Sequence, residues 1–184
     1  MLRRSETMAV DALARGGLVA YPTEGVWGLG CDPDNPHAVA RLLAAKRRDV
    51  AQGLILIAHD FAALEPWIAL PSRTAVRRAL ATWPGPTTWL FPAADDAPGW
   101  ITGDSDRIAV RVTAHRPAAR LCRAWGGALV STSANRSGEP PADGPTAVRR
   151  CFGAELDALL PGPLGGLGRP SQIRDVRSGY LVRA

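Results

Sequence analysis

The sequence places an arginine inside an apolar run. Arg111 lies in the segment Ala109-Val110-Arg111-Val112, whose apolar residues are typical of a buried strand. Burying an unpaired charge is costly, so this guanidinium needs either an internal carboxylate or a bound anion. Because its planar fork matches a carboxylate with two parallel hydrogen bonds, Arg111 is a candidate for holding an acidic substrate.

A dense set of hydrogen-bonding groups follows another predicted strand. Residues 130–138 read Val-Ser-Thr-Ser-Ala-Asn-Arg-Ser-Gly and carry four hydroxyls and one amide. These groups suit phosphate or carboxylate oxygens, although the same residue types also form ordinary local turns. Two further hydroxyls stand at strand entrances, since Thr88 follows the rigid turn at 83–86 and Ser171 precedes the segment 172–176.

Two segments nearer the N-terminus add a carboxylate and two cations. Residues 21–30 read Tyr-Pro-Thr-Glu-Gly-Val-Trp-Gly-Leu-Gly, a predicted loop in which Thr23 offers a hydroxyl and Glu24 a carboxylate for a ligand amine or a metal. A plain glycine turn is the alternative. Lys46 and Arg48 end a predicted helix, where the helix dipole alone also explains basic residues. Lys46 is the only lysine among 22 basic residues, and an ammonium does not replace a guanidinium in a crowded pocket. Retention of Lys46 by chance on a solvent-exposed helix face is an equally good explanation.

Several common site types are absent from the sequence. There is no P-loop signature, no dinucleotide fingerprint after a strand, no GxSxG elbow and no HExxH motif. The three histidines lie far apart and the three cysteines lack CxxC spacing, so we predict neither a metal site nor a disulfide framework. The remaining polar segments together predict a site for a polyanion and a small polar partner.

Composition predicts a soluble globular protein. A length of 184 residues fits one domain, predicted as 1–184, and 46% hydrophobic with 21% charged residues is an ordinary balance. No apolar run reaches the roughly 18–20 residues of a membrane helix, and no apolar stretch follows the N-terminal arginines. We therefore expect a cytoplasmic protein without membrane association. The net charge of +5 leaves RNA open as a partner.

The elements that must position these residues alternate between helices and strands. Helices are predicted from Ser5 or Thr7 to Gly16, from Asn35 to the Lys46 region, and over 60–67, 72–82, 117–125 and 146–152. Strands are predicted at 18–21, 54–58, 87–91, 108–112, 128–131, 156–160, 172–176 and 180–183. This alternation predicts an α/β domain, and connections too short for a crossover helix predict a twisted, mixed parallel and antiparallel sheet with flanking helices. The polar segment 136–145 is a predicted loop, a candidate flap over the site.

Seven motifs occur in order along the chain. They are residues 21–30, Lys46-x-Arg48, Gly-Leu-Ile-Leu-Ile at 53–57, Trp-Pro-Gly-Pro-x-Thr at 83–88, Ala-Val-Arg-Val at 109–112, Ser-Thr-Ser-Ala-Asn-x-Ser-Gly at 131–138 and Pro-Ser-x-Ile-Arg-Asp at 170–175. In this combination the chain resembles the YrdC-like family over almost its whole length, in the short bacterial form that lacks an additional C-terminal domain. The resemblance implies a twisted, mixed α/β sheet with a concave, positively charged face.

The family's activity is the synthesis of L-threonylcarbamoyladenylate and pyrophosphate from L-threonine, bicarbonate and ATP. A transferase complex then passes the threonylcarbamoyl group to an adenosine next to the anticodon of certain tRNAs. The resemblance therefore implies an enzyme with ATP as substrate, Mg²⁺ bound through the ATP phosphates, and the transferase complex as partner. It also implies that catalysis consists mainly of positioning and of stabilising charge on phosphate oxygens.

Matching motif positions imply individual roles. The residues expected on the ATP side are Lys46, Arg48, Thr88, Ser133, Asn135 and Arg183. Those expected to hold threonine are Thr23, Arg111, Ser131 and Ser171, with Arg111 on the carboxylate. The groups expected to carry the catalysis are Lys46, Arg48 and Arg111.

The chain departs from the family pattern at two notable positions. Many relatives carry a substrate-contacting histidine in the strand 54–58, where this chain has Ile57. His59, two positions on, could share that face because side chains alternate along a strand. Asp49 replaces a proline that commonly follows the Lys-x-Arg pair, which bears on the conformation of that loop.

Two other functions are compatible with these features. An RNA-binding module without catalysis would use a stripe of surface arginines, for which the candidates are Arg73, Arg77, Arg78, Arg149 and Arg150. Such a module has no need of Arg111 between apolar neighbours. A carbamoyl-transfer domain of the kind fused into hydrogenase maturation factors shares the fold, but it normally comes with additional domains.

Overall fold

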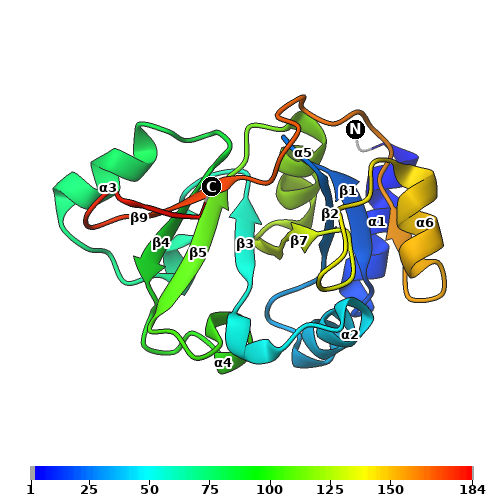
Figure 1. Ribbon diagram of the computed structural model, residues 1–184, viewed down its shortest axis with the longest axis horizontal. Helices are drawn as coiled ribbons and strands as arrows, with labels where there is room; N and C mark the ends of the chain where they lie inside the picture. Colours follow the sequence, from blue (N-terminus) through cyan, green and yellow to red (C-terminus); the bar gives the residue numbers. More distant parts are fainter. Residues whose placement is uncertain (1–2, 184) are drawn as a thin grey trace.

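Two β-sheets with flanking helices make up the structure (Figure 1). The computed structural model describes residues 3–183, so the first two residues and the last residue of the predicted domain 1–184 lie outside the described range. The larger sheet has the strand order β10-β9-β4-β5-β3-β6, and the smaller one has the order β7-β2-β1-β8. Parallel pairs (β3 with β5, β4 with β9, β1 with β8) occur beside antiparallel ones, which confirms the predicted mixed α/β architecture. The division into two sheets was not predicted.

The bounds of the elements are as follows. The larger sheet contains β3 (Ile55–Ala58), β4 (Thr87–Pro92), β5 (Arg107–Val112), β6 (Leu129–Val130), β9 (Gln172–Asp175) and β10 (Leu181–Arg183). The smaller sheet contains β1 (Val19–Pro22), β2 (Trp27–Gly30), β7 (Thr132–Ser133) and β8 (Ala158–Leu159). The helices are α1 (Arg4–Ala14), α2 (Pro36–Lys46), α3 (Arg73–Leu80), α4 (Gly99–Thr102), α5 (Arg116–Trp125) and α6 (Pro145–Phe152), with 3₁₀ turns η1 (Val50–Gln52) and η2 (Glu65–Trp67).

Capping residues begin two of the predicted helices. The Asn35 side chain accepts hydrogen bonds from the backbone N–H groups of His37 and Ala38, both at 3.1 Å, and Pro36 occupies the first turn of α2. At α3 the Ser72 hydroxyl accepts from the N–H of Ala75 at 3.3 Å. These bonds satisfy donors that the first helical turn leaves free, so both helices begin where the sequence predicts.

The structure corrects three local predictions. Residues 27–30, predicted as a loop because of their glycines, form strand β2 antiparallel to β1. The glycines allow close packing: a Cβ at Gly30 would lie 2.1 Å from the carbonyl oxygen of Val130. The predicted helix at 60–67 is reduced to the turn η2, and the predicted strand at 128–131 divides into β6 and β7, which belong to different sheets.

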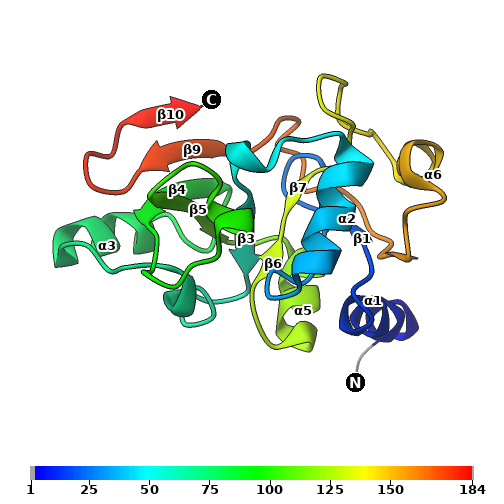
Figure 2. The same cartoon turned by 90° about the horizontal axis from the view of Figure 1, so that it is seen from below.

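Buried apolar residues lie on both faces of the larger sheet. Leu56, Ala58, Val110 and Val112 pack into the main core, whereas Ile57 belongs to a second cluster beside α1 and α5. Figure 2 shows helices α1 and α5 on the side of the molecule opposite to the C-terminal strands β9 and β10. No helix within residues 3–183 is long and apolar enough to cross a membrane.

A buried tyrosine joins the two sheets. Tyr21, on β1 of the smaller sheet, is fully buried, and its hydroxyl donates to the carbonyl oxygen of Val130 on β6 of the larger sheet at 3.1 Å. Directly after β6, the N–H of Ser131 donates to the carbonyl oxygen of Ile55 at 2.8 Å. The relative placement of the two sheets, and of the residues where the chain passes between them, thus depends on buried hydrogen bonds.

Removing the Tyr21 hydroxyl is expected to weaken this connection. In Tyr21→Phe we expect the free energy of unfolding to fall by about 1 kcal/mol, because a buried carbonyl loses its donor while the ring packing is retained. Urea denaturation with an unchanged m-value would measure the loss. The matched control is Tyr180→Phe, since Tyr180 is 78% exposed. Equal stability of the two variants would contradict this role for Tyr21.

Candidate functional site

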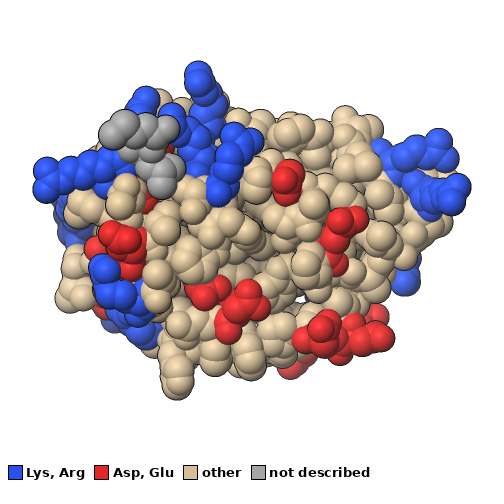
Figure 3. All heavy atoms as spheres, turned by 180° about the vertical axis from the view of Figure 1, so that it is seen from behind, with Lys and Arg blue, Asp and Glu red and all other residues tan. Residues whose placement is uncertain are grey.

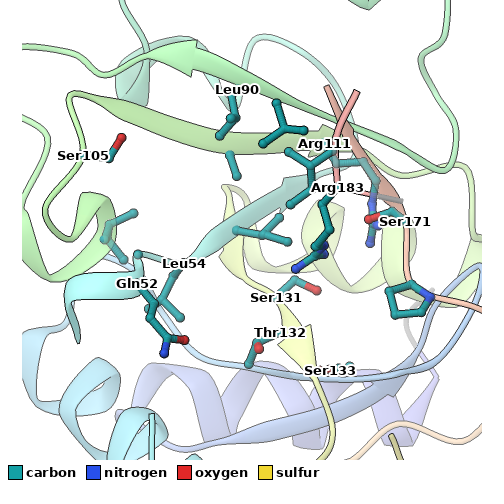
Figure 4. A pocket seen from close by; sticks show the side chains of 18 of the residues that line it. Gln52, Leu54, Leu90, Ser105, Arg111, Ser131, Thr132, Ser133, Ser171 and Arg183 are labelled. Atoms are coloured by element: carbon teal, nitrogen blue, oxygen red, sulfur yellow. The ribbon is translucent and has the colours of Figure 1, made fainter. Parts of the chain in front are cut away.

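A cavity of about 660 Å³ opens on one face of the larger sheet (Figure 4). Its walls come from β3, β4 and β5, from the turn at 23–28, from η1 and from the C-terminal residues 170–183. The predicted site residues that line it are Thr23, Arg48, Arg111, Ser131, Ser133, Ser171 and Arg183. Residues far apart in the sequence therefore meet around one space, as the resemblance implied.

Alternation along β5 explains how an arginine in an apolar run reaches this space. Ala109 and Arg111 line the cavity, while Val110 and Val112 point into the core on the opposite face. On the neighbouring strand, Ile57 is paired with Arg111 and is completely buried. His59, the possible substitute for the family histidine, instead lies with its Nε2 3.1 Å from Asp60.

Arg111 is the most confined cation of the cavity. It is 6% exposed, and its Nη2 lies 3.7 Å from the Oε2 of Glu24. Glu24 is held by the Thr113 hydroxyl at 2.7 Å and by the N–H of Ala114 at 3.0 Å, both donating to Oε1. The Nε of Arg111 and the Oε2 of Glu24 have no hydrogen-bond partner among the described residues. An internal carboxylate thus balances the charge of Arg111 and leaves its donors available to a ligand.

Three further arginines line the cavity with Arg111, and one of them, Arg107, is paired with Asp175 at 3.2 Å. Arg48 donates from Nη2 to the carbonyl oxygen of Gly53 at 2.9 Å, and Arg183 reaches the same space from β10 (Figure 4). Burial, and then the charge of Arg183, lowers the pKa of Arg48 below its usual value. Burial, and then the charge of Arg111, lowers the pKa of Arg183 in the same way. No Asp or Glu is among the described residues that line the cavity, so a polyanion would relieve this repulsion.

Three predicted site residues do not line the cavity. Thr88 is fully buried behind Ser171, with their hydroxyl oxygens 2.9 Å apart, because the parallel pairing of β4 with β9 covers it. The side-chain amide of Asn135 donates hydrogen bonds to the carbonyl oxygens of Arg136 and Glu139, and these bonds close the turn after β7. Lys46 points its ammonium at the backbone carbonyls of Ser133 and Asn135. The cavity lining therefore does not include these three side chains, and the ligand contacts expected of them stay predictions.

The segment 161–171 belongs to the site; the sequence predicted Ser171 in it, but not the contacts of residues 161–169 with the turn at 23–25. The N–H of Gly165 donates to the carbonyl oxygen of Thr23 at 3.0 Å, and the N–H of Leu167 donates to that of Glu24 at 2.9 Å. A Cβ at Gly25 would lie 1.8 Å from the carbonyl oxygen of Arg169. These contacts hold the segment on the turn at 23–25 and bring Ser171 to the cavity. The sequence signal that could have indicated this contact is a glycine on each side of it, Gly25 in the turn and Gly165 in the segment.

No metal cluster is formed by side chains of the described chain. Within residues 3–183, no group of three or more His, Cys, Asp or Glu is placed to hold an ion.

Comparison with known proteins places this geometry in a family. The family model Sua5/YciO/YrdC, described as telomere recombination, matches residues 11–184. The chain belongs to the Sua5/YciO/YrdC family. Threonylcarbamoyl-AMP synthase of Alkalilimnicola ehrlichii is 57% identical over 176 residues, covering 94% of this chain and 91% of the relative. The protein of the same name from Halorhodospira halophila is 58% identical, covering 95% and 92%.

Solved structures of the Sua5/YciO/YrdC family share the fold. Sua5 of P. abyssi, complexed with L-threonine, matches with a TM-score of 0.88 and 31% identity over 96% of this chain. This chain spans 52% of that Sua5 chain. YciO of E. coli matches with a TM-score of 0.86 at 23% identity, covering 98% of this chain and 88% of that one, which supports the fold alone.

A side chain at Gly25 is expected to displace the segment 161–171. In Gly25→Ala the new Cβ would overlap the carbonyl oxygen of Arg169, so that segment must move away from the turn at 23–25. Overpacking of this kind costs about 1–3 kcal/mol, so we expect the amides of Gly165 and Leu167 to exchange with solvent about tenfold faster. Hydrogen exchange read by NMR would measure the change.

The control for this prediction is Gly99→Ala. Gly99 is exposed, and a Cβ there has no atom within 4 Å. Its amide exchange pattern at 165–167 should equal that of the unmodified protein. Unchanged exchange in Gly25→Ala would show that the close approach to Arg169 does not hold the segment.

Proposed function

We propose that this chain makes L-threonylcarbamoyladenylate and pyrophosphate from L-threonine, bicarbonate or CO₂, and ATP, for the threonylcarbamoyladenosine modification of tRNA. The observation that carries the proposal is the meeting of the buried Arg111 with the guanidinium groups of Arg48 and Arg183 and with several hydroxyls in one cavity. The names of the relatives that are 57% and 58% identical support it. The enzyme is therefore a nucleotidyltransferase of the threonylcarbamoyl-AMP synthase type.

Threonine fits the end of the cavity where Arg111 lies. The free donors of the guanidinium suit the carboxylate, and Ser131 and Ser171 offer hydroxyls around it. The Thr23 hydroxyl donates to the carbonyl oxygen of Val26 at 2.7 Å, so its oxygen is left to accept a hydrogen bond from the substrate. Sua5, at 31% identity, has been solved with L-threonine, which supports an amino-acid subsite in this fold.

ATP fits the remaining space. Arg48 and Arg183 are the cations for its phosphates, with Ser133 as a hydroxyl donor. The other end of the cavity is lined mostly by uncharged side chains, among them Gln52, Leu54 and Ser105, which Figure 4 shows away from Arg111 and Arg183. Arg107, whose N–H donates to the Ser105 hydroxyl at 3.0 Å, adds a cation there. This end suits the nucleoside. Mg²⁺ carried by the phosphates needs no carboxylate from the chain, so the donor set of the cavity agrees with a metal that enters with ATP.

The chemistry asked of the protein is positioning and charge stabilisation. The threonine amine attacks the carbon of CO₂ and loses a proton, and a carbamate oxygen then attacks the α-phosphorus of ATP. The bond from that phosphorus to the bridging oxygen breaks, and pyrophosphate leaves with the electron pair. Arg111 fixes the carboxylate of the attacking molecule, and Arg48 and Arg183 balance the negative charge that develops on the phosphate oxygens.

The RNA-binding alternative has weaker support. On the face opposite to Figure 1, basic side chains gather at the two ends of the molecule with acidic ones between them, so that face offers no continuous basic stripe (Figure 3). The buried Arg111 would also serve no purpose in binding an RNA backbone. Direct contact with tRNA, the transferase complex as recipient and a cytoplasmic location stay predictions from the resemblance.

Pyrophosphate release tests the proposal. Purified protein with ATP and bicarbonate should release pyrophosphate only when L-threonine is added. Arg111→Lys keeps a positive charge beside Glu24 but loses the planar fork, so we expect the KM for threonine to rise about 30-fold, with a much smaller change in the KM for ATP. Arg73→Ala, on the exposed face of α3, should behave like the unmodified protein.

A different result of the same assay would contradict the proposed synthase activity. Folded protein that releases no pyrophosphate with any combination of substrates, but binds an RNA duplex tightly, would contradict the synthase and favour the RNA-binding module.

A further inference from the structure

A second cavity lies apart from the candidate site. Its volume of about 470 Å³ is within the range of ligand pockets, roughly 300–1,000 Å³. Its walls come from the loop before α2, from η2, from the residues before α4 and from the end of α5. None of the described residues that line it lines the first cavity, so a molecule bound here would leave the candidate site open.

Two carboxylates line this second cavity without a cation to balance them. Asp34 and Asp96 belong to its wall, and the described lining residues include no Lys, Arg or His. Neither carboxylate forms an ion pair within residues 3–183. Burial, reinforced by the charge of Asp34, raises the pKa of the neighbouring Asp32, although the N–H of Asp34 opposes this shift. Negative charge is thus left uncompensated here, in a chain whose net charge is +5.

The end of α5 adds to the negative character of the cavity. Trp125 is the last residue of α5, and Gly126, with φ 90°, ends the helix by donating its N–H to the carbonyl oxygen of Cys122 at 2.9 Å. Carbonyl groups in the last turn of a helix carry partial negative charge, and Trp125, Gly126 and Gly127 all line the cavity. The wall as a whole therefore favours a cation.

A tryptophan in the wall has a donor without an acceptor. Trp67 is 8% exposed and packs in the main core, so its ring is held in place. The indole N–H groups of Trp83 and Trp100 each donate to a carbonyl oxygen, whereas that of Trp67 meets no acceptor within residues 3–183. Trp67 reaches solvent at the cavity that it lines, so its N–H is left for an acceptor on a ligand.

Hydrogen bonds fix the segments that carry these groups. The N–H of Ala94 donates to the carbonyl oxygen of Trp67 at 3.1 Å, which joins η2 to the segment before α4. The indole of Trp100, on α4, donates to the carbonyl oxygen of Pro33 at 3.1 Å, which joins the loop of Asp34 to the same helix. The two carboxylates and the tryptophan are therefore held around one hollow by the fold.

These groups together suit an arginine side chain within a peptide. A guanidinium pairs with carboxylates and stacks on an indole ring, and its planar shape makes it better suited to this than an ammonium. The free N–H of Trp67 requires an acceptor, and a peptide backbone supplies a carbonyl oxygen next to the arginine side chain. A polyamine offers donors alone, and Asp34 and Asp96 would repel the phosphates of a nucleic acid.

We propose that the second cavity is a docking surface for a protein partner, which inserts an arginine side chain of an extended segment between Asp34 and Asp96. The guanidinium meets the carboxylates and the ring of Trp67, and a carbonyl oxygen of the segment accepts a hydrogen bond from the indole N–H. This surface does not depend on the proposed function, since it shares no described lining residue with the candidate site.

Peptide binding tests the recognition of the guanidinium. The probe is acetyl-Gly-Arg-Gly-amide, and the comparison peptide carries citrulline, a neutral side chain of nearly the same shape, in place of arginine. With the full chain at low salt, we expect the arginine peptide to shift the indole N–H signals of Trp67 and Trp125 in NMR spectra. It should also bind at least about tenfold tighter than the citrulline peptide, because charge-assisted hydrogen bonds are the stronger ones. Equal affinities, or no shift of these signals, would overturn the proposal.

Carboxylate variants locate the binding. Asp34→Asn combined with Asp96→Asn should weaken binding of the arginine peptide at least about tenfold, because both ion partners are lost. The matched control combines Asp11→Asn with Asp143→Asn, which removes the same charge from exposed positions outside the cavity and should bind like the unmodified protein. Equal weakening in the two double variants would mean that only long-range attraction acts, and it would exclude the cavity as the docking surface.

A probe without a carbonyl group tests the indole N–H. Propylguanidinium carries the same cation, so we expect the arginine peptide to bind the unmodified protein at least about threefold tighter than propylguanidinium does. In Trp67→Phe this difference should disappear, and the comparison of the two probes on the unmodified protein decides the matter if that variant does not fold. Propylguanidinium that binds as tightly as the peptide would indicate a small cation as ligand and would contradict a protein partner.

Pyrophosphate release separates this proposal from the proposed function. Asp34→Asn combined with Asp96→Asn should release pyrophosphate at the same rate as the unmodified protein, since neither residue lines the candidate site. Loss of release in the folded double variant would place the cavity in the reaction and overturn its role as a separate docking surface. No release from the unmodified protein contradicts the proposed function instead, and the peptide measurements still decide the role of the cavity.

Discussion

The burial of Arg111 in a cavity that other guanidinium groups also line is the constraint on which the rest of this structure depends. Removing an ion from water costs several kcal/mol, and Arg111, at 6% exposure, bears this cost near like charges. Among residues 3–183, Glu24 is the carboxylate that offsets it directly, and that carboxylate is itself fixed by Thr113 and Ala114. The core must therefore supply the remaining stability, which agrees with the extensive apolar packing on both faces of the larger sheet.

The turn at 23–25 gathers most of the compensating interactions. Its hydroxyl and its carboxylate face the site, its two carbonyls accept bonds from Gly165 and Leu167, and its glycine contacts the backbone of Arg169. A short turn with one small residue thus joins the anion-binding strand β5 to the segment that carries Ser171. Since each of these groups needs the others in place, the motif around this turn is positioned by tertiary contacts and not by its local conformation.

The sequence predicts the elements well where local chemistry decides and poorly where packing decides. Asn35 and Ser72 begin helices through bonds within the same turn, so their positions follow from residue type. Gly28 and Gly30 also look like loop residues, yet they form β2 because Tyr21 and Val130 approach them closely. In the same way Arg111 was identifiable from its apolar neighbours, whereas no local pattern shows that Thr88 lies behind Ser171 or that Lys46 bonds a distant backbone.

The same fold at 23% identity in YciO indicates that the two-sheet framework tolerates extensive sequence change, so function has to be located in the side chains of the cavity. In this chain contacts within the folded protein position those side chains, and the folded protein bears their mutual repulsion. A ligand with several negative charges would relieve that repulsion at the same place where the cations orient it. Binding of a polyanion and correct placement of its reacting atoms are, for this reason, consequences of one arrangement.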